Sequence, residues 1–236
     1  MCGIVGYTGK QSVAKQILDA LELLEYRGYD SAGMAIVDET NGQVQIRKRA
    51  GRVADLEKVW KANPVNGICG IGHTRWATHG GVSDVNAHPH RAGRVTLVHN
   101  GIIENYEELK DHFGLADELI SDTDSEVVAA VLNRFYTGDP HEALFQTVKC
   151  LKGTFALVVI FDDIPDVIFA IRNVSPIVAA YREDGTMLAS DVAALGGQAT
   201  SYMVVPEYHV VELHTDDIRV YNMKNELCKA EFLDID

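Results

Sequence analysis

Short apolar runs separated by turn residues constrain the fold of this chain more than any other feature. Parallel strands need long crossover connections, usually helices, whereas antiparallel strands can follow one another through tight turns. The pattern therefore predicts antiparallel sheets. The runs lie at 68–73, 95–99, 154–161, 167–172, 177–181, 186–190, 208–213 and 217–221.

The N-terminal part predicts a strand, a helix and a hairpin. Residues 3–8 form an apolar run typical of a strand, and 12–26 carries apolar residues at helical spacing, with Ser12 able to cap its start and Gly28 following its end. The segments 33–38 and 43–49 flank Asn41-Gly42, a strong hairpin signal. This pair should be antiparallel.

Two further segments, 124–136 and 141–152, have the apolar spacing of helices. With about ten strands and three or four helices, the chain is α+β, and two packed sheets flanked by helices would bury both sheet faces. No repeat or Gly/Ser/Pro linker is visible, so we expect a single domain over 1–236.

Charge and composition exclude several classes of protein. The formal net charge is −13, which disfavours binding to nucleic acid. The longest apolar run, 155–161, is far shorter than the roughly 20 residues of a membrane-spanning helix. Because no signal-like segment opens the chain, we expect a cytoplasmic protein. Its irregularly spaced cysteines, Cys2, Cys69, Cys150 and Cys228, predict reduced thiols.

Cys2 is the first candidate for chemistry. A thiol is a strong nucleophile near neutral pH, and removal of Met1 would give Cys2 a free α-amine. The reference pKa of such an amine is about 7.7–8.0, so it can act as a general base for the adjacent thiol. Taken alone, Cys2 is more simply a small apolar residue entering a strand.

Other residues supply what a cysteine needs to attack an amide. Asn100-Gly101 offers a side-chain amide and a backbone N–H to a developing oxyanion, although Asn-Gly is also a common turn. Arg75 and an aspartate such as Asp124 have the charges to bind the α-carboxylate and α-ammonium of an amino acid. Each alone is equally compatible with a surface ion pair.

Several stretches taken together are more specific than any one residue. They are MCGIVG (1–6), LEYRGYDSAG (24–33), HTRWATHG (73–80), NAHPH (86–90), HNGIIEN (99–105) and SDTDSEV (121–127). With these stretches the chain resembles the glutaminase domain of class II, N-terminal-nucleophile amidotransferases, and its long motifs are similar to those of the glutamine–fructose-6-phosphate branch. The segments LKGTFAL (151–157), RNVSPIV (172–178) and ASD (189–191) also fit. The resemblance implies a four-layer αββα sandwich of the N-terminal nucleophile hydrolase type.

The resemblance also implies a role for individual residues. Cys2 matches the nucleophile, Asn100 and Gly101 match the oxyanion hole, and Arg27 matches a residue that helps to position that hole. The implied substrate-binding residues are Arg75 for the glutamine carboxylate, Trp76, Thr78 and His79 in a closing loop, and Asp124 for the α-ammonium. Spacing alone does not separate Asp124 from Asp122.

The implied reaction is hydrolysis of L-glutamine to glutamate and ammonia through a Cys2 thioester. In full-length relatives the ammonia would pass to isomerase domains that bind fructose-6-phosphate, and no segment of this chain resembles those domains. We expect no cofactor and no metal, since the histidines between His73 and His99 lack partners at ligand spacing.

Two rival hypotheses stay open. An N-terminal cysteine hydrolase of other amides would have less use for a paired Arg75 and Asp124. A non-catalytic domain would be favoured if Met1 is retained, because the blocked Cys2 nitrogen could not serve as base.

Overall fold

The computed structural model describes residues 1–235; Asp236, the last residue of the expected domain, lies outside the described residues. Its strands form two sheets, and every strand pairing within them is antiparallel. The antiparallel arrangement expected from the short apolar runs is therefore confirmed.

The first sheet has eight strands in the order β15-β11-β9-β10-β1-β4-β2-β3. Their bounds are β1 Gly3–Gly9, β2 Ser31–Val37, β3 Val44–Ala50, β4 Cys69–Arg75, β9 Val178–Arg182, β10 Gly185–Ala189, β11 Ser201–Val204 and β15 Leu233–Asp234. The predicted hairpin joins β2 to β3, with Gly42 in the left-handed region at φ 70°.

The second sheet has seven strands in the order β14-β13-β12-β8-β7-β6-β5. Their bounds are β5 His90–Ala92, β6 Val95–Ile103, β7 Gly153–Phe161, β8 Ile164–Asn173, β12 Val210–Leu213, β13 Ile218–Tyr221 and β14 Leu227–Cys228. All eight apolar runs of the sequence lie in strands of one sheet or the other. The strands β5, β11, β14 and β15, which have two to four residues each, were not expected.

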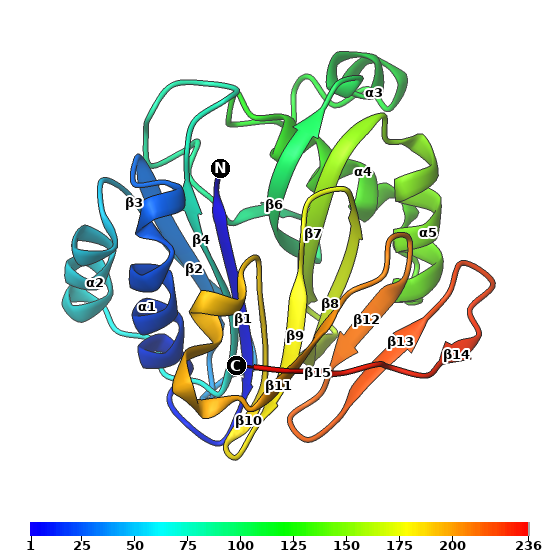
Figure 1. The fold of residues 1–236 in the computed structure, drawn as a ribbon. Helices are drawn as coiled ribbons and strands as arrows, with labels where there is room; N and C mark the ends of the chain where they lie inside the picture. The colour runs from blue at the N-terminus through cyan, green and yellow to red at the C-terminus, as the bar shows by residue number, and fades with distance from the viewer. Residues whose placement is uncertain (236) are drawn as a thin grey trace.

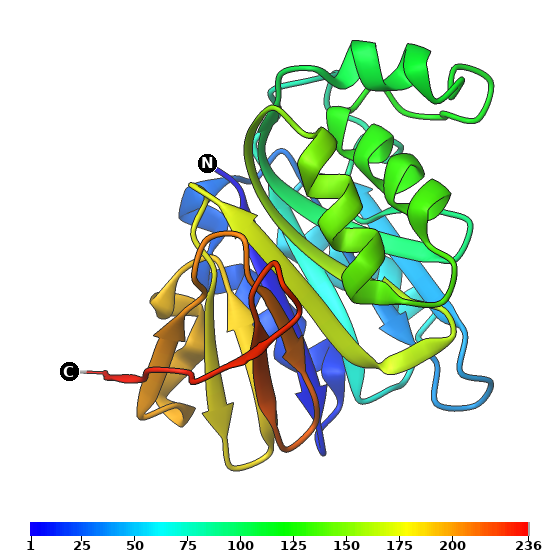
Figure 2. The same ribbon diagram turned by 90° about the vertical axis from the view of Figure 1, so that its right-hand side faces the viewer.

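Helices cover the outer faces of both sheets (Figures 1 and 2). One apolar core lies between the first sheet and α1 and α2, a second between the second sheet and α3, α4 and α5, and a third between the two sheets. The fold is thus the predicted α+β, four-layer αββα sandwich. The helices are α1 Val13–Leu23, α2 Val53–Ala62, α3 Tyr106–His112, α4 Asp124–Phe135 and α5 Pro140–Cys150.

The first helix is shorter than expected. It begins after Ser12, whose side chain makes no capping hydrogen bond, and it ends at Leu23. A 3-10 turn, η1 (Glu25–Arg27), follows α1 and ends at Gly28. A Cβ at Gly28 would lie 2.8 Å from both the Arg75 carbonyl carbon and the Trp76 nitrogen. Glycine therefore lets η1 approach the end of β4 closely.

Strand pairing brings distant functional motifs together. Gly3 at the start of β1 pairs with Thr74 near the end of β4, so Cys2 lies beside the HTRWATHG motif. In Figure 1 the N-terminus lies between the two sheets, at the same end of the sandwich as the last residues of β6 and the start of α4. Within residues 1–235, none of the helices has the length and apolar character needed to cross a bilayer.

Candidate active site

One cavity of about 310 Å³ opens at this end of the sandwich. Every residue selected from the sequence as catalytic or substrate-binding lines it. These residues are Cys2, Arg27, Arg75, Trp76, Thr78, His79, Asn100, Gly101 and Asp124. Strands, a loop and a helix N-terminus therefore converge on a single concave site, as is typical of small-molecule pockets.

The Cys2 thiol lines the cavity, is held by a backbone hydrogen bond and is uncharged at neutral pH. Its Sγ accepts a hydrogen bond from the Trp76 backbone N–H at 3.1 Å, and it also lies 3.4 Å from the Trp76 carbonyl oxygen. Burial raises the pKa of the Cys2 thiol above its ordinary value, although the Trp76 N–H and nearby positive charge oppose this. The thiol form therefore predominates at neutral pH, and attack needs a base.

The main chain of Cys2 is anchored from two directions. Its carbonyl oxygen accepts hydrogen bonds from Arg27 Nε at 3.1 Å and from Asn100 Nδ2 at 3.0 Å. The Arg27 guanidinium also forms an ion pair with Asp191 at 3.0 Å, and Asp191 in turn accepts a 2.6 Å hydrogen bond from the Tyr26 hydroxyl. Arg27 thus contacts the main chain of the candidate nucleophile while its charge is balanced by Asp191.

Asn100 and Gly101 are consecutive residues of β6. Asn100 is buried, and its Oδ1 lies 3.0 Å from His73 Nε2. Gly101 has φ 120°, which L side chains rarely adopt, and a Cβ there would lie 2.1 Å from the Thr154 carbonyl oxygen. Glycine is therefore required both by the backbone conformation and by the close approach of β7.

Arg75 ends β4 and organises the loop that follows it. Its buried guanidinium donates to the carbonyl oxygens of His79, of Gly80 at 3.3 Å and of Gly81 at 3.0 Å. Trp76 and Thr78 of this loop are exposed, whereas His79 is half-buried. The Ala77 N–H also donates to Asp30 at 2.8 Å, which fixes where the loop leaves the strand.

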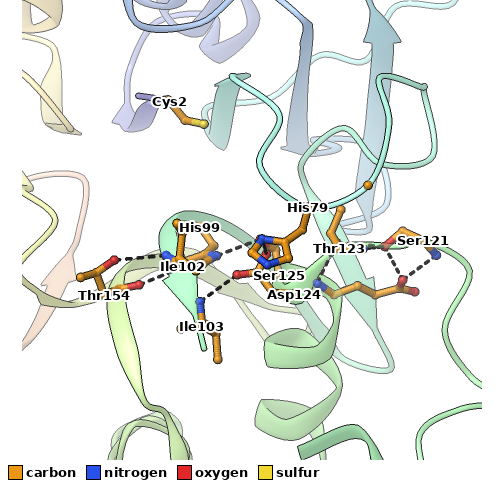
Figure 3. A network of polar contacts seen from close by, with 12 residues as sticks. Cys2, His79, His99, Ile102, Ile103, Ser121, Thr123, Asp124, Ser125 and Thr154 are labelled. Atoms are coloured by element: carbon orange, nitrogen blue, oxygen red, sulfur yellow. Dashed lines mark hydrogen bonds and ion pairs between the residues drawn. The ribbon is translucent and has the colours of Figure 1, made fainter. Parts of the chain in front are cut away.

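Asp124 is the first residue of α4 and is buried at the floor of the cavity. Its Oδ2 accepts from the Ile103 N–H at 2.9 Å, and its Oδ1 lies 3.9 Å from His79 Nδ1 (Figure 3). Asp122, which spacing left as an equal candidate, contacts Asn86 instead and does not line this cavity. The helix N-terminus further favours a negative charge at Asp124.

Four buried histidines lie beneath the site; from the sequence they were only weak candidates for a metal site and had no assigned role in the reaction. His99 Nδ1 lies 2.8 Å from Ser125 Oγ, and its Nε2 lies 3.5 Å from the Thr154 carbonyl oxygen (Figure 3). His73 and His88 stack with ring centroids 3.9 Å apart. All four belong to the HTR, HPH and HNG segments, but their contacts depend on strands far apart in the sequence. The group comprises His73, His88, His90 and His99.

The other cysteines and the histidines show no competing site. All four cysteines are free, and burial raises the pKa of Cys69 to about 12, which leaves it an unreactive thiol. Within residues 1–235, no group of three or more His, Cys, Asp or Glu side chains is arranged to hold a metal ion.

Comparisons with known proteins agree with this geometry. A family model described as a glutamine amidotransferase domain matches residues 35–236. Two glutamine–fructose-6-phosphate aminotransferases (isomerizing) are similar: that of Clostridium acetobutylicum, 39% identical over 98% of this chain and 38% of the relative, and that of Streptomyces coelicolor, 46% identical over 93% and 36%. The chain thus spans about two fifths of the length of the curated relatives it matches.

A solved structure shares the fold at low sequence identity. The Bacillus subtilis glutamine phosphoribosylpyrophosphate amidotransferase superimposes with a TM-score of 0.81 at 20% identity, over 96% of this chain and 50% of that chain. The likeness confirms the fold, an αββα sandwich. The family match begins at residue 35, whereas the match to the Clostridium relative covers 98% of the chain.

Proposed function

The chain belongs to the glutamine amidotransferase domain family, and we propose that it hydrolyses the side-chain amide of L-glutamine to glutamate and ammonia through a thioester on Cys2. The observation that carries this proposal is the convergence of a thiol, oxyanion donors, a buried cation and a buried carboxylate on one cavity of about 310 Å³. Hydrolysis of the side-chain amide of a free amino acid uses all four: the thiol and the oxyanion donors act on the amide, and the two charged groups bind the α-carboxylate and the α-ammonium.

In the first half of the reaction, the Cys2 α-amine takes the thiol proton and Sγ bonds to the amide carbon of glutamine. The carbonyl oxygen then becomes an oxyanion. Asn100 Nδ2 has two hydrogens, one of which is bonded to the Cys2 carbonyl oxygen, so the other can donate to the oxyanion beside the Gly101 N–H. Collapse of this intermediate breaks the C–N bond, and the α-ammonium gives its proton to the departing nitrogen, which leaves as ammonia.

In the second half, water attacks the glutamyl thioester while the amine again accepts a proton. The C–S bond breaks, glutamate leaves, and the thiol is restored. This scheme needs a free Cys2 amine, because burial keeps the thiol protonated at neutral pH. Removal of the exposed Met1 is therefore part of the proposal.

We propose that the side of the cavity away from Cys2 binds the α-carboxylate and α-ammonium groups of glutamine. Arg75 would supply positive charge to the α-carboxylate, and Asp124 would bind the α-ammonium. Trp76, Thr78 and His79 would close over the substrate. Three backbone carbonyls already accept hydrogen bonds from the Arg75 guanidinium. The substrate carboxylate would therefore bind the N–H groups of Arg75 that remain free when the loop closes.

The wider role is proposed from the relatives. We propose that residues 1–236 form a single glutaminase domain and that its ammonia supplies the synthesis of glucosamine-6-phosphate from fructose-6-phosphate in a longer protein with sugar-phosphate isomerase domains. The chain's share of about two fifths of such relatives supports this arrangement. A reducing compartment keeps Cys2 a thiol, so we propose that the protein is cytoplasmic.

The test is glutamate release from glutamine by the chain with Met1 removed. Activity should appear with the processed chain and be lost in Cys2→Ala, a small change at the chain end that leaves the cores intact. Matched controls are Cys69→Ala, Cys150→Ala and Cys228→Ala, which should retain activity. Turnover by Cys2→Ala above the uncatalysed rate would refute the assignment, and full activity with Met1 retained would refute the role of the amine.

A further inference from the structure

We propose that His73 is a positioning residue whose Nε2–H group fixes the Asn100 side-chain amide with its nitrogen toward Cys2. The inference rests on the proposed glutamine hydrolysis and adds a residue to it. His73 lies on β4 in the first sheet and Asn100 on β6 in the second, so their contact crosses the core between the sheets. The oxyanion donor is thereby tied to the strand that ends in Arg75.

The contacts of His73 require a hydrogen on Nε2. This nitrogen lies 3.0 Å from Asn100 Oδ1 and 3.2 Å from the His99 carbonyl oxygen. A backbone carbonyl oxygen can only accept, so the ring nitrogen must donate. Because the His99 carbonyl belongs to the peptide bond that joins His99 to Asn100, one N–H group contacts both this peptide bond and the Asn100 side chain.

The other tautomer of His73 is disfavoured at both nitrogens. Nδ1 is buried and has no hydrogen-bond partner among the described residues, so a hydrogen there would be a buried donor without an acceptor. An unprotonated Nε2 would then point its lone pair at two oxygens. Burial also lowers the pKa of His73 to about 3, so the ring is neutral at physiological pH.

The neighbouring His88 holds the His73 ring in this orientation. The two rings stack at 3.9 Å with an interplanar angle of 12°. His88 Nδ1 accepts a hydrogen bond from the His99 backbone N–H at 3.2 Å, which ties His88 to the same strand, β6. His73 therefore cannot turn without disturbing a packed ring.

A fixed donor on His73 determines which way the Asn100 amide faces. Oδ1 must face His73, so Nδ2 faces the Cys2 carbonyl oxygen at 3.0 Å, with one N–H group left for the oxyanion. A turned amide would set Oδ1 against the Cys2 carbonyl oxygen and its NH₂ group against the His73 N–H. Both contacts would be repulsive, so the orientation of the oxyanion donor depends on the tautomer of His73.

Two variants of His73 separate this role from simple packing. In His73→Gln the terminal amide can place an N–H near the position of Nε2, whereas in His73→Asn it ends near the position of Nδ1. Both replacements are uncharged amides. Removing an oxyanion donor outright typically lowers kcat by ~10²–10³, so we expect His73→Asn to lower kcat by about 10- to 100-fold with little change in KM. His73→Gln should stay within a few-fold of the unaltered chain.

A double-mutant cycle with Asn100→Ala tests whether His73 acts through Asn100. In the Asn100→Ala background, His73→Asn should have no further effect on kcat. If the two effects on kcat multiply, His73 acts elsewhere and the proposal is overturned. It is equally overturned if His73→Asn folds and keeps full kcat, or if both His73 variants fold and lose kcat to the same degree.

A measurement on the unaltered chain keeps the proposal testable if the variants do not fold. The ¹⁵N chemical shifts of the His73 imidazole should identify a neutral Nε2–H tautomer at pH 7. A neutral Nδ1–H tautomer or a charged ring would overturn the proposal. This result does not depend on turnover: an unaltered, Met-free chain that fails to release glutamate would refute the proposed function while leaving the tautomer assignment intact.

Discussion

The cavity has two sides that are held in place differently. The strand-held side consists of Cys2, immediately before β1, and of Asn100 and Gly101 in β6; the Cys2 carbonyl oxygen accepts hydrogen bonds from Asn100 and from Arg27. The loop-held side consists of Arg75, the last residue of β4, and of Trp76, Thr78 and His79, whose loop is shaped chiefly by contacts to Arg75.

This difference predicts a division of labour. Strand pairing and buried hydrogen bonds fix the strand-held side before substrate arrives, which suits groups that must meet a transition state. The loop-held side can adjust, because few buried apolar contacts restrain its exposed Trp76 and Thr78. Changes on the strand-held side should therefore alter kcat, and changes on the loop-held side should alter KM.

The largest effect after loss of Cys2 itself is expected from Asn100→Ala. The change removes a side-chain donor that matters most when the oxyanion forms, so kcat should fall by ~10²–10³ with a smaller change in KM. Steady-state glutamate release measures both constants. A variant with raised KM and unchanged kcat would contradict the division between the two sides.

Arg75→Ala should chiefly weaken glutamine binding. A hydrogen bond to a charged group contributes about 1.5–3 kcal/mol, so KM should rise roughly 10- to 100-fold. Arg75→Lys keeps the charge but loses the planar fork that contacts the loop carbonyls, and we expect an intermediate KM. If either variant lowered kcat by as much as Asn100→Ala while leaving KM unchanged, Arg75 would belong functionally to the strand-held side.

Acid should destabilise the fold through the histidines beneath the strand-held side. Burial lowers the pKa values of His73, His88, His90 and His99, so below about pH 6.5 the unfolded chain binds protons that the folded chain does not. Stability should therefore fall as the pH decreases from about 6.5, and the contribution of His73 is lost down to about pH 3.

The size of this acid effect can be estimated. Each of these histidines removes up to about 1.4 kcal/mol of stability per pH unit. His141 opposes them, because its hydrogen bonds to Glu212 and Asn225 outweigh its burial and raise its pKa. Denaturant unfolding at pH 6.5 and pH 5.5 should show the loss, and exposed His112→Gln should leave it unchanged. Equal stability at the two pH values would contradict the neutral, buried state of the group.

The smallest effect expected is that of fructose-6-phosphate on this chain. Every residue proposed for amide cleavage lies between Cys2 and Asp124, and we expect no site here for a sugar phosphate. Adding fructose-6-phosphate should leave glutamate release unchanged, and no amino sugar should form. Marked stimulation, or any glucosamine-6-phosphate, would reveal an acceptor site within these residues.

The fold could be predicted from the sequence where burial is strong. The apolar runs gave the strands, and the spacing in 124–136 and 141–152 gave α4 and α5, with Thr123 capping α4 by accepting from the Glu126 N–H. The helix α2 was missed because only Val53 and Leu56 are buried in a segment rich in charge. The three-residue strand β5 is too short to leave a periodic signal.

Motifs in the sequence predicted which segments form the site, but they did not predict every contact between those segments. Spacing could not separate Asp124 from Asp122, because the choice depends on which carboxylate accepts from the Ile103 N–H in a strand about 20 residues earlier. His73 was not selected, since its partner Asn100 lies in the other sheet. Both features depend on contacts between residues more than 20 positions apart in the sequence, which no local pattern encodes.

The most direct test is an intact-mass measurement after treatment with an electrophilic analogue of glutamine. The Met-free chain should gain one adduct, and peptide mapping should locate it on Cys2. Arg75→Ala should slow labelling at low analogue concentration, because the carboxylate is bound less tightly, whereas Cys2→Ala should remain unlabelled. An adduct on Cys69, Cys150 or Cys228, or equal labelling of Cys2 while Met1 is still attached, would contradict a nucleophile activated by its own amine.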